Sequence, residues 1–208
     1  MGDSLIALSG KDFVLIAADA SVAPNIMVLK GDEDKIYEMD GDKLLAVQGE
    51  AADRIEFAGY TVRNTALHYY RTGHSLTPRA AAAWVQTELA KAIREDPYQV
   101  RCFIAGVEKG AAHLYAVDGY GAMQKLNYGA QGYAQYLVLG ILDRYWREDL
   151  NLEQAEQLLG MCVDHVKRRL ALNNPRHIVK AVTPEGIKVR PLMEGGQMVP
   201  PTRPFHME

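Results

Sequence analysis

Short apolar runs separated by turn-forming residues fill the first 48 residues and predict β-strands. The first two runs flank a polar turn at residues 9–12, and the next two flank Asp40-Gly41-Asp42. An Asp-Gly pair between apolar runs is typical of a tight hairpin turn. We therefore expect four strands in two hairpins, at residues 5–7, 13–18, 35–37 and 44–47.

The pattern then changes to apolar positions spaced three to four residues apart, which predicts two helices. The first is expected to end just before Gly73, because glycine is favoured beyond a helix C-terminus. The second is expected to begin with Thr77 as N-cap and Pro78 as its first residue, and to continue to Asp96-Pro97. The expected core-facing residues are Ile55, Ala58, Val62, Ala66 and Tyr69, then Trp84, Val85, Leu89 and Ile93.

Strands return in the middle of the chain. Two runs at 100–107 and 111–118 flank a turn at 108–110, and a further run follows at 122–126. A third helix is expected from about residue 132 to 145. Its core-facing residues are predicted to be Tyr136, Leu139, Gly140 and Asp143.

Capping residues predict the start of a fourth helix. Asn151 is a favourable N-cap, and Gln154 stands three residues later, so the two form a capping box. The apolar stripe that follows is Ala155, Leu158, Leu159, Cys162, Val166 and Leu170. Two short strands at 177–182 and 186–189 complete the pattern before a tail rich in proline and glycine.

This order of elements (strands, two helices, strands, two helices, strands) indicates an α+β protein, because strands and helices come in separate runs. Two antiparallel sheets packed face to face, with a helix pair on each outer surface, would bury all the apolar stripes. The sequence therefore predicts a four-layer αββα sandwich. We expect one domain over residues 1–190 and an extended C-terminal tail over 191–208.

Charge, cysteine content and the N-terminal residues exclude several classes of partner and location. The chain of 208 residues has a formal net charge of −3, which gives no reason to expect nucleic acid or a membrane surface as partner. Cys102 and Cys162 lie in apolar surroundings and are expected to be buried free thiols of a reducing compartment. The N-terminus shows neither a secretory signal nor a transit peptide, so we expect the cytoplasm and nucleus. No histidine spacing suggests a metal site, and no cofactor is expected.

Four stretches carry a resemblance to a known family: VLIAADAS, DKIYEMDGDKLLAVQGEAAD, FIAGVEKGAAHLYAVDGYGA and LGILDRYW. In this order and spacing they resemble the beta-type subunits of the proteasome, members of the N-terminal-nucleophile hydrolase superfamily. The resemblance runs from about residue 3 to 189. GYAQYLVLGILDRYW and LALNNP are similar to the beta type-4 branch of the eukaryotic 20S core, which is non-catalytic.

The resemblance implies where a catalytic site would lie. In active members an N-terminal threonine attacks the substrate carbonyl, its own α-amine acts as base, and a lysine beside an aspartate supplies positive charge. Asp19 and Lys35 fall on the positions of that aspartate and lysine, and Gly49 falls on a glycine that borders the substrate groove. Asp3 replaces the threonine, and no threonine precedes Thr61.

Three further positions depart from the active pattern. Tyr133 and Asn173 stand where the resemblance implies serines, and Leu170 stands where it implies a second aspartate. Asp19 is also interpretable as a turn-forming or ion-pairing residue, and Lys35 as a structural partner of Asp19 or Asp3. We therefore expect no catalytic residue and regard all seven positions as vestiges of the site.

Two functions stay open on the sequence alone. The chain is expected to be a non-catalytic structural subunit that assembles with other alpha and beta subunits in a 28-subunit core, with assembly chaperones as possible further partners. The alternative is an active N-terminal-nucleophile hydrolase with an unusual nucleophile. The tail is expected to form an arm on a neighbouring subunit, anchored by Phe205, rather than to pack on its own domain.

Overall fold

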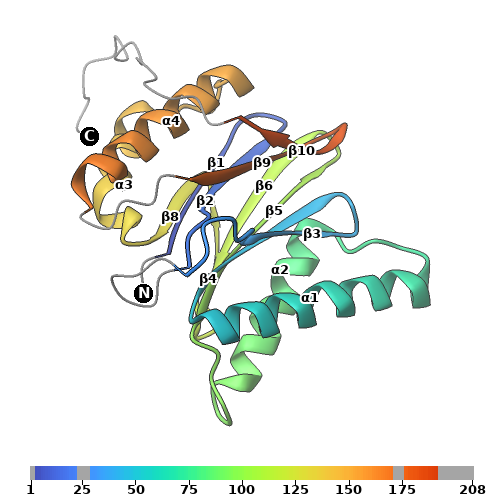
Figure 1. Cartoon of the computed structure of the whole chain (residues 1–208). Coiled ribbons are helices and arrows are strands. Elements are labelled where there is room, and N and C mark those ends of the chain that lie inside the picture. The colour runs from blue at the N-terminus through green and yellow to red at the C-terminus, as the bar shows by residue number, and fades with distance from the viewer. Residues whose placement is uncertain (1–2, 23–28, 171–175, 192–208) are drawn as a thin grey trace, which may run out of the picture.

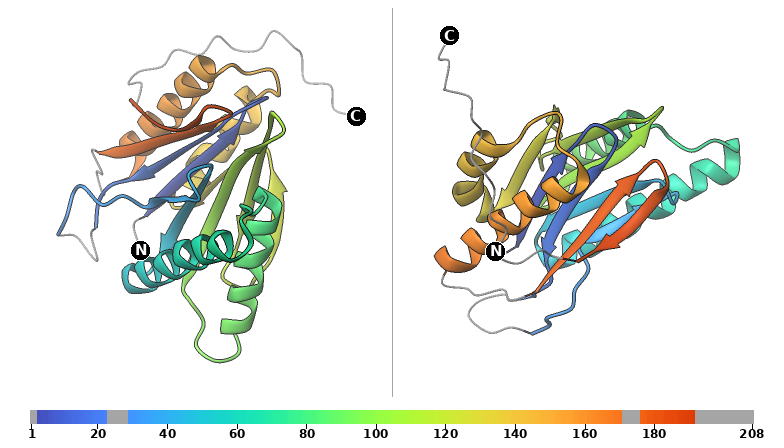
Figure 2. Two further views of the ribbon diagram at one scale, coloured as in Figure 1. Left: turned by 90° about the vertical axis from the view of Figure 1, so that its right-hand side faces the viewer. Right: turned by 90° about the horizontal axis from the view of Figure 1, so that it is seen from above.

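Two five-stranded antiparallel sheets lie face to face between two pairs of helices in the computed structural model of the chain (Figure 1). It describes residues 3–22, 29–170 and 176–191. The layered arrangement is clearest when the molecule is turned (Figure 2). The prediction of an α+β, four-layer αββα sandwich is confirmed.

The first sheet, here called the β1 sheet, is built around the N-terminal hairpin. Its order is β10-β9-β2-β1-β8, so the hairpin β1-β2 lies in the middle. The bounds are β1 Ser4–Ser9, β2 Val14–Asp19, β8 Tyr128–Gly132, β9 His177–Thr183 and β10 Gly186–Arg190. Every residue of β1 and β2 is buried, because this hairpin is covered on both faces.

The second sheet, here called the β4 sheet, has the order β3-β4-β5-β6-β7. Its strands are β3 Ile36–Met39, β4 Lys43–Gly49, β5 Val100–Glu108, β6 Ala111–Val117 and β7 Met123–Leu126. The inner faces of the two sheets meet in a buried cluster that includes Leu5 and Ile16 from one sheet and Leu44 and Phe103 from the other. This cluster fixes the end of β2 against the start of β3.

Each helix pair covers the outer face of one sheet, as Figure 1 shows. Helices α3 (Ala134–Tyr145) and α4 (Leu152–Arg169) cover the β1 sheet, and α1 (Ala51–Thr72) and α2 (Pro78–Ala92) cover the β4 sheet. The local helix signals are confirmed: Thr77 accepts from the amide of Ala80, and Asn151 and Gln154 form a complete capping box. Gly73 is the C-cap of α1, as predicted.

The predicted face of α1 is partly wrong. Ile55 and Tyr69 are 55% and 47% exposed, whereas Phe57, Ala58 and Thr61 are buried against the β4 sheet. The buried face also carries an arginine and two threonines, so hydrophobicity alone does not reveal it. Helix α2 ends at Ala92, four residues before the predicted stop at Asp96-Pro97.

Helix α3 departs further from its prediction than α1 and α2 do, both in where it begins and in which face is buried. It begins at Ala134, because the preceding residues form strand β8, which pairs with β1 and was not predicted. The predicted core-facing residues of α3, Tyr136, Leu139, Gly140 and Asp143, are exposed, and Ala134, Val138 and Leu142 are buried instead. Apolar residues surround most of this helix, so its periodicity does not select one face.

The stripe predicted for α4 is buried except Leu170, which is partly buried at the C-cap. Cys102 and Cys162 are buried free thiols, as predicted. Of the predicted tail, residues 192–208, including Phe205, lie outside the described residues, as does Asn173.

Candidate functional site

Asp3, Asp19 and Lys35 meet where the two sheets come together. Asp3 directly precedes β1, Asp19 is the last residue of β2, and Lys35 directly precedes β3. The antiparallel register of β1 and β2 places Asp19 beside the start of β1, and the amide of Ser4 donates to Asp19 Oδ1 over 2.7 Å. The hairpin and the packing of β3 therefore bring the three side chains together.

The ammonium group of Lys35 is fully engaged. Its Nζ lies 2.6 Å from Asp3 Oδ1, 3.0 Å from Asp19 Oδ2 and 2.8 Å from the carbonyl oxygen of Ser21. An ammonium has three protons to donate, and the three acceptors account for all of them. Because the side chain of Lys35 is 0% exposed, this lysine acts as the buried centre of an ion cluster.

The two carboxylates differ in environment. The side chain of Asp19 is 1% exposed, and that of Asp3 is 17% exposed. Burial raises the pKa of Asp19, although the charge of Lys35 and the amide of Ser4 act in the opposite direction. The nearby charge of Asp3 adds to the increase in this pKa.

Arg54 on α1 extends the cluster and was not among the predicted site residues. This residue is 1% exposed; its Nη1 lies 3.2 Å from Glu33 Oε1 and 3.4 Å from the hydroxyl of Tyr37. Its Nε lies 3.9 Å from Asp3 Oδ2, which is close enough for an ion pair but too long for a hydrogen bond. The only sequence signal is that Arg54 lies one helical turn before Ala58, which is buried on the same face.

A cavity of about 380 Å³ opens beside Asp3. Three of the predicted positions, Asp3, Gly49 and Tyr133, line it, while Asp19 and Lys35 are not among its lining residues. Its other lining residues are Gln48, Ile93, Pro97, Tyr98, Gln99, Val100, Arg101, Gly119, Tyr120, Gly132, Gln135 and Tyr136. The cavity thus lies between the end of β4, the start of β5, the turn after β6 and the start of α3.

Two glycines shape the wall of this cavity. Gly132 has a φ of +73°, and a Cβ there would lie 1.8 Å from the carbonyl oxygen of Asp3. At Gly49 a Cβ would lie 2.0 Å from the carbonyl oxygen of Gln99. Side chains at these positions would displace the backbone, so both glycines hold the segments around Asp3 close together.

Comparisons with known proteins agree with this geometry. The protein family described as "Proteasome subunit" matches residues 1–182. The chain belongs to the proteasome subunit family. Among its relatives, "Proteasome subunit beta type-2" of Dictyostelium discoideum is 42% identical over 193 residues, which cover 91% of this chain and 97% of the relative.

Other relatives carry the beta type-4 name. "Probable proteasome subunit beta type-4" of Neurospora crassa is 39% identical over 186 residues, covering 88% of this chain and 92% of the relative. "Proteasome subunit beta type-4" of Saccharomyces cerevisiae is 34% identical over 189 residues, covering 89% and 96%. The predicted resemblance to proteasome beta-type subunits is confirmed, and the relatives carry both type-2 and type-4 names.

At this site, Asp3 occupies the position to which the resemblance gives a nucleophilic threonine in active members. Asp3 has a carboxylate that is bound to Lys35, and the buried hydroxyl of neighbouring Ser4 has no hydrogen-bond partner among the described residues. Burial raises the pKa of both cysteine thiols, that of Cys162 to about 12, so neither supplies a thiolate. None of the described residues favours the alternative of an active hydrolase with an unusual nucleophile.

The remaining predicted positions are separate from this cluster. Leu170 caps α4 and packs on the core beneath the helix pair, and it does not line the cavity. Tyr133 is the N-cap of α3 and makes no side-chain capping bond. Among the described residues, no group of three or more histidine, cysteine or acidic side chains could hold a metal ion. Nor is any described helix long and apolar enough to cross a membrane.

Proposed function

We propose that this chain is a non-catalytic structural subunit of the beta ring of the 20S proteasome core. The observation that carries this proposal is the ion pair between Asp3 and Lys35, with 2.6 Å between Nζ and Oδ1. The chain therefore has a carboxylate bound to Lys35 at the position where, by the resemblance, active members have a threonine hydroxyl.

This arrangement opposes catalysis in two ways. An aspartate side chain has no hydroxyl that could attack a carbonyl after giving up its proton. The neighbouring Ser4 does have a hydroxyl, but its backbone nitrogen lies in the β1 strand and donates to Asp19. Exposing an amine at Ser4 would require cleavage of the bond between Asp3 and Ser4 and would remove Asp3 from the ion cluster.

The proposed partners are the other alpha and beta subunits of a 28-subunit core, with assembly chaperones during its formation, in the cytoplasm and nucleus. Family membership supports assembly. So do large apolar side chains that remain exposed in the single chain, among them Ile55, Tyr70, Tyr136 and Val189. Contact with neighbouring subunits would remove such side chains from water.

A native-mass measurement of the tagged protein purified from its own cells tests this assignment. We expect a particle of many related subunits that contains this chain in a fixed, low copy number. Dissociation of the particle in the gas phase should release the neighbouring subunits individually and identify them. A lone monomer, or a particle built of this chain alone, would contradict the proposal.

A further inference from the structure

The segment that follows Asp164 is strongly basic. Residues 165–184 include five lysines and arginines and no acidic residue, although the whole chain has a formal net charge of −3. The five are Lys167, Arg168, Arg169, Arg176 and Lys180. Lys180 forms ion pairs with two acidic residues at β3. In contrast, Arg168, Arg169 and Arg176 are exposed and form no hydrogen bond or ion pair with any residue that the structure describes.

Helix stability explains only part of this arrangement. The helix dipole stabilises a cation in the last turn of a helix, and the effect is small beyond that turn. Lys167, Arg168 and Arg169 lie in the last turn of α4, but Arg176 directly precedes β9. Burial and then the charge of Lys167 lower the pKa of His177, the residue after Arg176, so the start of β9 lies close to the end of α4. Positive charge from two elements therefore gathers at this end of the β1 sheet.

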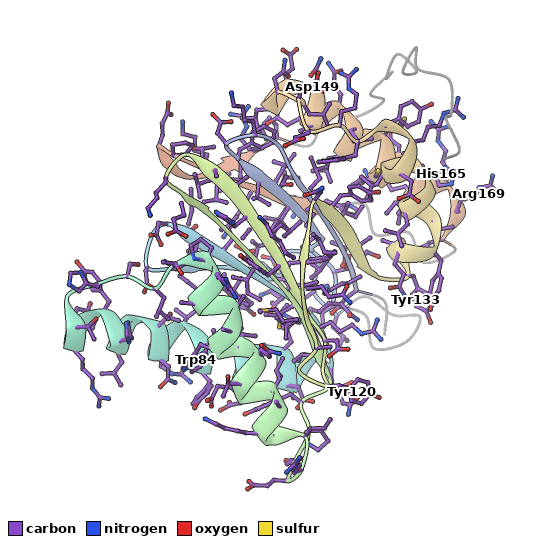
Figure 3. The ribbon with its side chains drawn as sticks, turned by 180° about the vertical axis from the view of Figure 1, so that it is seen from behind. Trp84, Tyr120, Tyr133, Asp149, His165 and Arg169 are labelled. Carbon is purple, nitrogen blue, oxygen red and sulfur yellow. The ribbon has the colours of Figure 1, made fainter. Side chains whose placement is uncertain are left out.

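Two exposed tyrosines lie at the same end of the helix pair. Helices α3 and α4 are joined by residues 146–151 and pack in one buried cluster, so they are antiparallel and the start of α3 lies beside the end of α4. Tyr133 and Tyr136, at the start of α3, are 48% and 79% exposed. Figure 3 shows Tyr133 and Arg169 on the same side of the molecule. These two tyrosines and the three exposed arginines are here called the basic patch.

The basic patch has the composition of a protein interface. Tyrosine and arginine are over-represented among the residues that dominate the affinity of protein contacts. The proposed function assigns the exposed ring of Tyr136 to a contact with a neighbouring subunit. A subunit that covers this ring also removes the arginines at the end of α4 from water, and a guanidinium that loses water without gaining a carboxylate is strongly unfavourable. The partner therefore has to supply the carboxylates.

We propose that the basic patch binds an acidic segment of a neighbouring subunit, in which an aspartate or glutamate pairs with Arg168 or Arg169 and an apolar side chain packs on Tyr136. This inference rests on the proposed function, because it requires a neighbouring chain. Arginine binds a carboxylate through two parallel hydrogen bonds, which fixes the orientation of the contact as well as its charge. Nucleic acid suits the patch less well, because the chain as a whole is negatively charged.

Photo-cross-linking in purified particles tests this contact. Tyr136 is replaced by p-benzoylphenylalanine in the full-length chain, which keeps an aromatic ring at this position. Particles are purified through a tag on this chain and irradiated, and mass spectrometry locates the cross-linked peptides. We expect a cross-link to a different subunit of the particle, within a segment that contains aspartate or glutamate.

Charge variants show whether the arginines hold this segment. Arg168→Glu/Arg169→Glu should reduce the cross-link at least about tenfold, because attraction becomes repulsion, whereas Arg168→Lys/Arg169→Lys should retain most of it. The matched control is Arg71→Glu, which also changes an exposed arginine in the last turn of a helix and should leave the cross-link unchanged. Changing the cross-linked acidic residue of the partner to arginine should restore the cross-link of the double glutamate variant.

A neutral variant keeps the test decisive if the double glutamate chain does not enter particles. Arg168→Gln/Arg169→Gln should reduce the cross-link several-fold. The proposal is overturned if this variant gives an unchanged yield, if cross-links are absent or confined to this chain, if the cross-linked segment has no acidic residue, or if nuclease treatment removes the cross-link.

The native mass of the particle separates this inference from the proposed function. Particles that contain this chain but give no cross-link to an acidic segment would refute the inference alone. Absence of the chain from any larger particle would refute the proposed function itself.

Discussion

Replacing Lys35 by methionine tests the view that Asp3, Asp19 and Lys35 stabilise the fold as a buried ion cluster. Methionine keeps much of the volume of the side chain but removes the ammonium that binds Asp3, Asp19 and the carbonyl of Ser21. Asp19 is 1% exposed, so its carboxylate would remain buried while losing the charge of Lys35.

The size of the effect follows from this burial. Removing one partner of a buried ion pair costs about 3–5 kcal/mol, because the remaining charge is left in a poorly solvated site. Asp3 is 17% exposed and can regain water, which places the expected cost toward the lower end, about 3 kcal/mol. That cost corresponds to an increase of roughly 100-fold in local opening.

Native-state hydrogen exchange followed by mass spectrometry measures this opening in purified particles. Amides of β1 and β2 should exchange roughly 100-fold faster in Lys35→Met, while those of α2 change little. The matched control is Lys188→Met, which breaks an exposed contact with Glu185 and should leave the exchange rates nearly unchanged.

The double variant Lys35→Met/Asp19→Asn isolates the charge effect. It also removes the negative charge of the buried Asp19 side chain, so it should be more stable than Lys35→Met alone by about 1–2 kcal/mol. A cost below about 1 kcal/mol for Lys35→Met, or no recovery in the double variant, would refute the reasoning.

Three further predictions concern the same region. Burial, with Lys167 and Lys35 nearby, lowers the pKa of His177 from 6.5 to about 4. As pH falls below 6.5, His177 becomes protonated in the unfolded chain before it does in the folded one. The free energy of unfolding should therefore decrease by roughly 3 kcal/mol between pH 6.5 and pH 4. An acid titration of the His177→Gln variant should lack this decrease. Gly132→Ala should destabilise the β1-β8 pair by more than about 1 kcal/mol, whereas Gly140→Ala, on an exposed helix face with open space, should stabilise α3 by roughly 0.5–1 kcal/mol in hydrogen exchange. Asp3→Thr should add no peptide cleavage to that of the sister subunits in assembled particles, because the nitrogen of residue 3 stays in a peptide bond.

The parts of the fold that local chemistry determines could be predicted from the sequence. Capping at Thr77 and Asn151 depends on side chains within three residues of the helix start, and the structure has both caps as expected. The turn at Asp40-Gly41 also follows from local backbone preference, since both residues have positive φ. The alternation of strand and helix runs was sufficient for the layered architecture.

Features that depend on distant partners could not be read from the pattern. Strand β8, with the sequence YGAQG, has few residues that favour strands and forms because β1 offers it a pairing edge. The buried face of α3 depends on which side meets α4 and the β1 sheet. Arg54 shows the same limit, because its burial is explained by Glu33 and Tyr37, which lie 21 and 17 residues away.

The candidate site was predictable to a similar extent. The resemblance identified Asp3, Asp19 and Lys35. In the structure, both carboxylates lie within hydrogen-bond distance of Lys35 Nζ, and Asp19 also accepts from the amide of Ser4. The resemblance did not indicate Tyr98, Tyr120 and Tyr136 around the cavity, because they come from separate turns and helix ends. Only the folded chain shows that they share a wall.

The most direct test of the central claim is labelling with a reagent that reacts with catalytic N-terminal threonines, such as a peptide epoxyketone, applied to particles purified through this chain. Each subunit is then separated and its intact mass measured. The account predicts that sister subunits gain the mass of the reagent while this chain stays unmodified at saturating concentration. A covalent adduct on residues 1–4 of this chain would contradict it.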